Sequence, residues 1–219
     1  MDNRIVLASN NNIAVPYTHF NRKPVFGIGI NDANHPTTVG GKRLRTYRTW
    51  TNMLQRCYHD HLQGRNVAYK GCTVEASWLR FSIFEQWMLT QDFDGNHLDK
   101  DLLAPGNKVY SADTCVFVPR SLNNLLEDSR STRGSLPLGV SYHKDVRKKR
   151  YAAKVSIQDA TLNLGTYYTA LEAHQAWQAA KADIIERFPT SDPRIRAALD
   201  LRVAQLRDDL LHNRITEKL

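Results

Sequence analysis

The chain has 219 residues, of which 42% are hydrophobic and 24% are charged, and its formal net charge at pH 7 is +8. This apolar content suffices for a packed core and excludes a disordered or fibrous chain. No segment holds the roughly 20 apolar residues that a membrane span needs, and the first residues lack the order of a signal peptide. We therefore expect a cytoplasmic protein without a membrane partner.

The positive charge lies in two blocks that flank an acidic one. Residues 22–70 hold nine Lys or Arg side chains against two acidic ones, and residues 133–157 hold seven against Asp145 alone. Between them, residues 71–130 hold five basic and nine acidic side chains. A polyanion suits such a chain, because each phosphate that Lys or Arg neutralises releases counterions. The pattern favours a nucleic-acid partner that is bound on either side of an acidic centre.

Three cysteines, Cys57, Cys72 and Cys115, lie far apart and form no CxxC pair. Their odd number and wide spacing argue against a disulfide framework and against a zinc knuckle. We expect buried thiols in a reducing compartment.

The first part of the chain predicts an arm followed by two helices. Residues 1–24 are polar and rich in Asn, which predicts a flexible arm, and residues 25–30 are apolar enough for a short strand. Aromatic and apolar residues recur at helical spacing over 46–58 and again over 76–90. Aromatic side chains at this spacing are typical of helices packed on a core.

The middle of the chain predicts strands and a helix. Residues 97–103 (HLDKDLL) and 108–119 favour strands, and a helix is expected to begin near Arg120. The order of elements is therefore strand, turn, strand, helix. Residues 129–136 are small and polar, which is typical of a linker.

The last part predicts a small sheet with helices. Strands are expected over 138–144, 150–157 and 160–167, followed by an amphipathic helix over 170–187. A last helix begins at Asp192-Pro193 and has one apolar face, which predicts packing on the body of the chain or self-association with a second copy. The predicted fold class is α+β: a helical N-terminal region, a ββα segment, a three-stranded antiparallel sheet with a helix, and a C-terminal helix.

Polar side chains that suit phosphodiester hydrolysis gather between positions 97 and 124. These candidates are His97, Asp99, Lys100, Asp101, Asn123 and Asn124. Asp99 and Asp101 share one face of the predicted strand, and Lys100 points to the other. The reaction needs a divalent cation on oxygen ligands and a base that activates water. An acidic turn that pairs with nearby Lys or Arg is the alternative that this spacing leaves open.

A run of ordered motifs extends over residues 25–128. It consists of Tyr47-Arg-Thr-Trp50, Met53-Leu-Gln-Arg-Cys-Tyr58, Tyr69-Lys-Gly-Cys-Thr-Val, Trp78, Phe81, Phe84, Leu98-Asp-Lys-Asp, Gly106-Asn-Lys-Val-Tyr-Ser, Thr114-Cys and Asn123-Asn124. This run resembles the phage-borne HNH endonucleases, several of which are homing enzymes. The resemblance implies a ββα-metal nuclease fold in an infected bacterial host. It also implies a Mg²⁺ or similar ion on Asp99 and Asn123, with Asp101 and Asn124 as further ligand candidates.

Position 100 departs from the family pattern. The residue directly after the metal-binding Asp is usually a His that serves as general base, and here it is Lys100. An unperturbed lysine has a pKa of about 10.4 and is a poor base at pH 7. Burial could lower this pKa, or Lys100 could stabilise the charged transition state. Otherwise His97 or a metal-bound water replaces the base, or catalysis is lost.

The predicted sheet has an apolar face toward its helix and a polar face away from it. The first face carries Val140, Tyr142, Ala153, Val155, Leu162 and Leu164, and the second carries Ser141, His143, Lys154, Ser156, Thr161 and Asn163. A polar face beside the basic cluster at 147–150 suits duplex DNA, because a β-ribbon fits the major groove. A plain solvated sheet face is the alternative.

The motifs of this sheet follow one another in a fixed order, as GVSYHK from Gly139, RYAAKVSI from Arg150 and LNLGTYYTALEAHQAW from Leu162. Over residues 136–185 they are similar to the DNA-binding domain of the plant ethylene-response-factor type. The resemblance implies base contacts from the outer sheet face, where this chain carries other residues than the family does. The predicted DNA-binding residues are His143, Lys144, Arg147, Lys148, Lys149, Arg150, Lys154, Ser156, Thr161 and Asn163, with the cations on phosphates.

Together these patterns predict a metal-dependent endonuclease that acts on double-stranded DNA. The expected divisions are an arm (1–24), a nuclease domain (25–128), a linker (129–136), a DNA-binding domain (137–188) and a C-terminal helix (189–219). The alternative is a catalytically inactive protein of the same fold that binds DNA or a host factor. A protein-interaction adaptor is a third class, and it predicts no salt-dependent affinity for DNA.

Overall fold

Two compact units make up the chain, Met1–Thr90 and Gln91–Leu219. The computed structural model describes residues 22–59, 69–127, 134–143, 150–157 and 160–219. Residues 1–21 of the predicted arm and 129–133 of the predicted linker lie outside the described residues, and the predicted domain boundaries stay predictions. Helices and small antiparallel sheets make up the described part, so the α+β class is confirmed.

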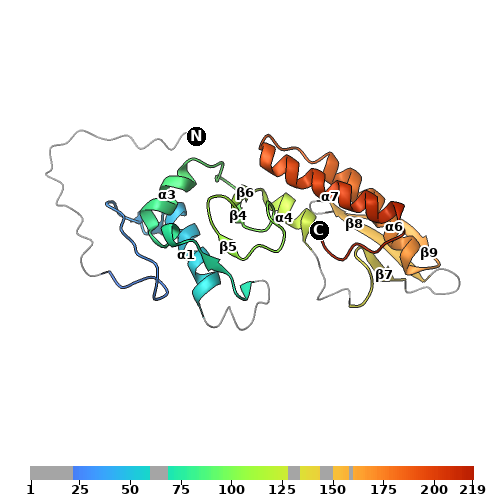
Figure 1. The fold of residues 1–219 in the computed structure, drawn as a ribbon, viewed down its shortest axis with the longest axis horizontal. Helices are drawn as coiled ribbons and strands as arrows, with labels where there is room; N and C mark the ends of the chain where they lie inside the picture. The colour runs from blue at the N-terminus through green and yellow to red at the C-terminus, as the bar shows by residue number, and fades with distance from the viewer. Residues whose placement is uncertain (1–21, 60–68, 128–133, 144–149, 158–159) are drawn as a thin grey trace. The chain divides into compact units, whose positions relative to one another are not determined.

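The first unit contains a short hairpin and two packed helices (Figure 1). Its elements are β1 (Thr38–Val39), β2 (Lys42–Arg43), α1 (Arg45–Tyr58), β3 (Thr73–Val74), the 3₁₀ helix η2 (Ala76–Leu79) and α3 (Phe81–Leu89). The helix predicted over 46–58 is confirmed. Residues 25–30, expected as a strand, make only isolated bridges between Val25 and Gly29 and between Ile30 and Arg80.

The helix predicted over 76–90 is interrupted at Arg80, which has an extended backbone. The main chain of Ile30 causes the break, because its N–H donates to the carbonyl of Leu79 at 2.8 Å and its carbonyl accepts from the N–H of Phe81 at 3.0 Å. The carbonyl of Leu79 and the N–H of Phe81 are therefore paired with Ile30 and not with a helix that continues through Arg80.

Aromatic side chains fill the core of the first unit. Trp50 on α1 is fully buried, its indole N–H donates to the carbonyl of Trp78 at 2.8 Å, and its ring lies 5.4 Å from that of Phe81. Gly29 lets the chain approach this core, since a Cβ there would lie 2.3 Å from a methyl carbon of Leu54. The predicted aromatic stripes are therefore ordinary core.

The second unit contains the predicted hairpin, sheet and last two helices. Its elements are β4 (His97–Asp99), β5 (Val109–Tyr110), β6 (Val116–Val118), α4 (Arg120–Leu126), β7 (Val140–Tyr142), β8 (Tyr151–Ile157), β9 (Ala160–Tyr167), α6 (Ala170–Glu186) and α7 (Pro193–Leu211). The single strand expected over 108–119 is split by a turn. In this turn the N–H of Cys115 donates to the carbonyl of Ser111, and the hydroxyls of Ser111 and Thr114 lie 2.8 Å apart.

Strands β7, β8 and β9 form an antiparallel sheet in that order, and α6 contacts all three of them. Val140, Ala153 and Val155 are buried, as predicted. Tyr142 and Leu162 were expected to face the helix in the same way, but they are 68% and 50% exposed. The helix covers the middle of this face, where Ala153 packs with Ala173 of α6, while Tyr142 and Leu162 stand toward opposite ends of the sheet.

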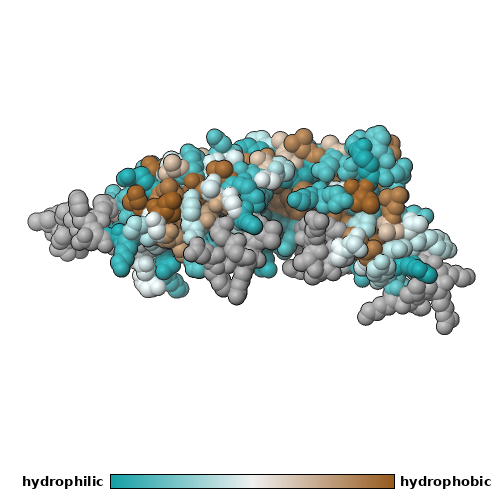
Figure 2. Space-filling view, turned by 60° about the horizontal axis from the view of Figure 1, so that its bottom comes forward, coloured by the Kyte–Doolittle hydropathy of each residue, from teal (hydrophilic) through white to brown (hydrophobic). Residues whose placement is uncertain are grey.

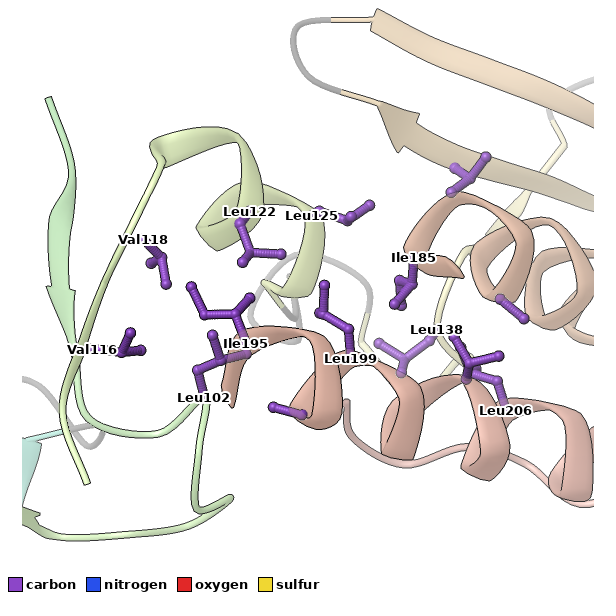
Figure 3. Packing of buried hydrophobic residues seen from close by; sticks show 14 of the residues in the cluster. Leu102, Val116, Val118, Leu122, Leu125, Leu138, Ile185, Ile195, Leu199 and Leu206 are labelled. Carbon is purple, nitrogen blue, oxygen red and sulfur yellow. The ribbon is translucent and has the colours of Figure 1, made fainter. Parts of the chain in front are cut away.

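One hydrophobic cluster joins the parts of the second unit (Figure 3). It combines Val118 of β6 and Leu122 of α4 with Ile185 of α6 and with Ile195 and Leu199 of α7. The last helix therefore packs on the body of its own unit, which is one of the two predicted arrangements. Self-association through this helix stays a prediction.

The residues after α7 fold back onto α6. The N–H of Thr216 donates to Nε2 of His174 at 2.9 Å, and Nδ1 of the same ring bonds to the carbonyl of Leu138. Gln178 donates to the Thr216 hydroxyl at 3.0 Å. The buried imidazole is therefore the neutral tautomer with its proton on Nδ1, because Nε2 must accept.

Hydrophilic side chains occupy most of the surface that is in view in Figure 2, with smaller hydrophobic groups between them. Across the part of the chain that the structure describes, no helix is long and apolar enough to span a bilayer.

Candidate functional site

The hairpin of β4 and β6 is followed directly by α4. In its antiparallel ladder His97 faces Val118 and Asp99 faces Val116. Cross-strand partners point to the same side of a sheet, so the two polar side chains share a face with the two valines. These valines pack in the same cluster as Leu122 of α4. Asp99 therefore lies on the side of the hairpin that packs against α4.

Asp99 is half-buried, and one of its two carboxylate oxygens is already engaged. Oδ1 accepts the main-chain N–H groups of Asp101 at 2.8 Å and of Leu102 at 2.6 Å. Oδ2 accepts no hydrogen bond from any described residue. The carboxylate thus shapes the turn after β4 and keeps one oxygen for another ligand.

Lys100 is 5% exposed and holds the loop that follows β4. Its ammonium donates to Oδ1 of Asp101 at 2.6 Å and to the carbonyl of Asn107 at 3.0 Å. The Asn107 side chain returns a hydrogen bond to the carbonyl of Lys100 at 2.9 Å. Strand β4 ends at Asp99, so the strand alternation that predicted a shared face for Asp99 and Asp101 does not reach Asp101.

Helix α4 presents two amide side chains. Leu122 and Leu125 point into the core, while Asn123 is half-buried and Asn124 is exposed. Neither amide makes a side-chain hydrogen bond with a residue that the structure describes. Both amide oxygens therefore remain accessible as acceptors or ligands.

A cation between the β4–β6 hairpin and α4 would need oxygen ligands. Within the described ranges, no group of three or more His, Cys, Asp or Glu side chains is placed to hold a metal ion. Mg²⁺ needs fewer protein ligands than that, because it usually keeps several waters and uses one or two carboxylates. The free oxygen of Asp99 and the amide of Asn123 are hard donors that fit this chemistry, whereas the buried thiol of Cys115 does not.

The cysteines are free and buried, as predicted. Burial raises the pKa of the Cys115 thiol to about 12. Because only a thiolate attacks or binds metal well, this group is inert at neutral pH.

A buried cation that the sequence analysis missed lies close enough to Asp99 to feel its charge. Arg202 of α7 is 6% exposed, its Nη1 donates to the carbonyl of Ala198, and its Nε has no partner among the described residues. Burial lowers the pKa of this guanidinium, and the negative charge of Asp99 opposes that effect. The sequence does contain a sign of this burial. Arg202 lies three residues after Leu199 and four before Leu206, which places it on the apolar face of the last helix.

The polar side of the three-stranded sheet gathers several predicted DNA-binding residues. Lys154 faces Asn163 and Ser156 faces Thr161 across β8 and β9, and all four side chains are exposed. We call these four residues the outer sheet face. Exposed His143 and Arg150 flank the β7–β8 connection, where the N–H of His143 donates to the carbonyl of Arg150. Lys144, Arg147, Lys148 and Lys149 lie outside the described residues.

Comparisons with protein-family models, with curated proteins and with solved structures found no match to this chain. The two family resemblances of the sequence therefore stay predictions.

Proposed function

We propose that this chain is a DNA endonuclease of the HNH type, which binds duplex DNA and hydrolyses it with the help of a divalent cation. The outer sheet face is the observation that carries the proposal. It presents one cation and three hydrogen-bonding side chains on a twisted ribbon whose opposite face is covered by α6. Such a surface suits a DNA groove, with Lys154 on phosphate and the amide and hydroxyl groups on base edges.

The hairpin around Asp99 is the proposed catalytic part. Oδ2 of Asp99 and the amide oxygen of Asn123 would hold the cation, with Asn124 and Asp101 as further donors. When bound, the cation supplies positive charge that stabilises the leaving oxygen. His97, which shares a strand face with Asp99 and is exposed, is the side chain that can take the proton from water.

Lys100 has a positioning role in this proposal. Its ammonium is engaged by Asp101 and by the carbonyl of Asn107, so it orders the loop after β4.

A second candidate function is DNA binding without cleavage. The engagement of Lys100 favours it, because the position that usually carries the base is occupied by a structural side chain. The same outer sheet face would then serve recognition alone.

Nicking of supercoiled DNA by the full chain, with Mg²⁺ or with a chelator, separates these functions. Asp99→Asn keeps the acceptor for the N–H groups of Asp101 and Leu102 but removes the charge, and Asp113→Asn is the matched control at an exposed carboxylate. We expect Mg²⁺-dependent nicking that is lost in Asp99→Asn and kept in Asp113→Asn. Binding without nicking by the wild-type chain would favour the second candidate. Nicking that survives Asp99→Asn would remove the site assignment.

A further inference from the structure

The β1–β2 hairpin of the first unit is fully exposed. Gly40 and Gly41 have φ values of 56° and 74° and connect Val39 directly to Lys42, which is the two-residue turn that suits a twisted hairpin. Every residue from 38 to 43 is exposed, and Val39 is 62% exposed. An isolated two-stranded hairpin is marginally stable in water, so this one gains little from the core. Its exposure suits a segment that contacts another molecule.

Four cations gather on this hairpin and on the helix that follows it. They are Lys42, Arg43, Arg45 and Arg48, and we call the three exposed ones, Lys42, Arg43 and Arg48, the hairpin surface. Three of them, Lys42, Arg43 and Arg48, are exposed and form no ion pair with a described residue. Residues 33–59 contain no Asp or Glu. Among the described residues, no carboxylate therefore offsets the charges of Lys42, Arg43 and Arg48, and an external anion can do so.

A carboxylate of α3 reaches the first turn of α1 and is already engaged there. Glu85 of α3 accepts from the hydroxyl of Thr46 at 2.7 Å, and its other oxygen pairs with Nε2 of His35 at 2.7 Å. Its side chain is 14% exposed. The carboxylate is therefore committed inside the unit and does not neutralise the hairpin surface.

The helices of the second unit show the opposite arrangement. Four arginines on or next to α7 are paired with carboxylates of the same unit, in the pairs Arg194–Asp192, Arg196–Asp200, Arg207–Glu186 and Arg214–Asp209. Such pairs leave little net charge for a partner. These four arginines therefore differ from Lys42, Arg43 and Arg48, which form no ion pair with a described residue.

We propose that the hairpin surface is a second phosphate-binding site for duplex DNA, in a different unit from the outer sheet face. This inference rests on the proposed function as a DNA-binding protein. Residues 38–43 hold no aromatic side chain, and the ring of half-buried Tyr47 on α1 packs 5.1 Å from that of Phe81. Single-stranded nucleic acid is usually bound by stacking its bases on aromatic side chains, so this surface suits the backbone of a duplex. Two weak sites on one chain raise the overall affinity through effective concentration.

The test measures binding of the full chain to duplex DNA over a series of salt concentrations. The variant Lys42→Ala/Arg43→Ala/Arg48→Ala removes three cations of the hairpin surface. The control Lys70→Ala/Arg187→Ala/Lys218→Ala removes three exposed cations elsewhere, so both variants lower the net charge by three. Since each phosphate contact contributes about 0.9 to the slope of log K against log salt, we expect the hairpin variant to reduce the slope by about 2 to 3 and the control to leave it unchanged. Thermal melting should agree between the two variants, since all the mutated side chains are exposed.

Each other outcome has a distinct meaning. An equal change in both triple variants would overturn the inference, because net charge alone would then explain the binding. An unchanged slope in the hairpin variant, together with a slope reduced by about one in Lys154→Ala, would overturn the inference and leave the proposed function standing. Absence of salt-dependent binding by the wild-type chain would overturn both.

Discussion

The ammonium of Lys181, on α6, donates a hydrogen bond to the main-chain carbonyl of Leu125, in the last turn of α4. Carbonyls at a helix C-terminus lack partners inside the helix and carry partial negative charge, so a cation is a favourable donor there. The ring of Trp177 lies 5.7 Å from the same ammonium. This contact joins the helix that carries Asn123 to the helix that covers the sheet.

The stability of the chain should depend on pH through Lys181. Burial lowers the pKa of its ammonium from 10.5 to about 8. Below pH 8 the lysine is protonated in both the folded and the unfolded state. Between about pH 8 and 10.5 the unfolded state binds more protons, so this group makes the free energy of unfolding rise with pH, by up to about 3 kcal/mol.

Urea unfolding at pH 7.5 and at pH 10 measures this effect. Lys181→Met keeps much of the side-chain volume and removes the titrating group. We expect the variant to gain less stability than the wild-type chain between these two pH values. An identical gain in both proteins would contradict the assigned role of Lys181.

Replacement of Gly139 should be far more damaging than replacement of Gly134. Both glycines have a left-handed backbone, with φ values of 73° and 66°. A Cβ at Gly139 would lie 1.9 Å from Cδ1 of Trp177, whereas a Cβ at Gly134 would meet nothing within 4 Å. Gly134→Ala should therefore cost only the left-handed penalty of about 1 kcal/mol, and Gly139→Ala should cost more than about 3 kcal/mol. Denaturant unfolding of the two variants measures the difference, and equal costs would refute the close packing.

Arg202 should weaken cation binding near Asp99. Its buried guanidinium feels the charge of Asp99 and repels a second cation at the same carboxylate. We expect Arg202→Met to bind Mn²⁺ roughly tenfold more tightly than the wild-type chain, in calorimetric titrations of the full chain. Adding Asp99→Asn to that variant should abolish the gain. Mn²⁺ affinity that is the same with and without Arg202 would show that the two cations do not compete.

Elements with a clear local period could be predicted from the sequence. The helix over 46–58 and strand β8 carry their burial pattern within a few residues, so their periodicity located them. The interruption at Arg80 could not be predicted in this way. It depends on hydrogen bonds from the main chain of Ile30, which lies some fifty residues earlier.

The candidate site shows the same division. The residue types at 99, 123 and 154 indicated metal and phosphate binding. A carboxylate or amide oxygen can ligate a metal ion, and an ammonium can bind phosphate, in any fold. Whether each group is buried or already hydrogen-bonded depended on the residues packed around it. Lys100 became a loop support because Asn107 and Asp101 reach it.

By itself, the sequence determined the fold class, the places of the longer helices and of the three-stranded sheet, and the basic character that points to a polyanion. Only the tertiary structure decided which charges are neutralised. Arg207 meets Glu186 and Lys181 meets the carbonyl of Leu125, while Lys42 and Arg43 meet no carboxylate among the described residues. The reason is physical: periodicity is a property of neighbouring residues, but burial and charge pairing arise from packing between segments that are distant along the chain.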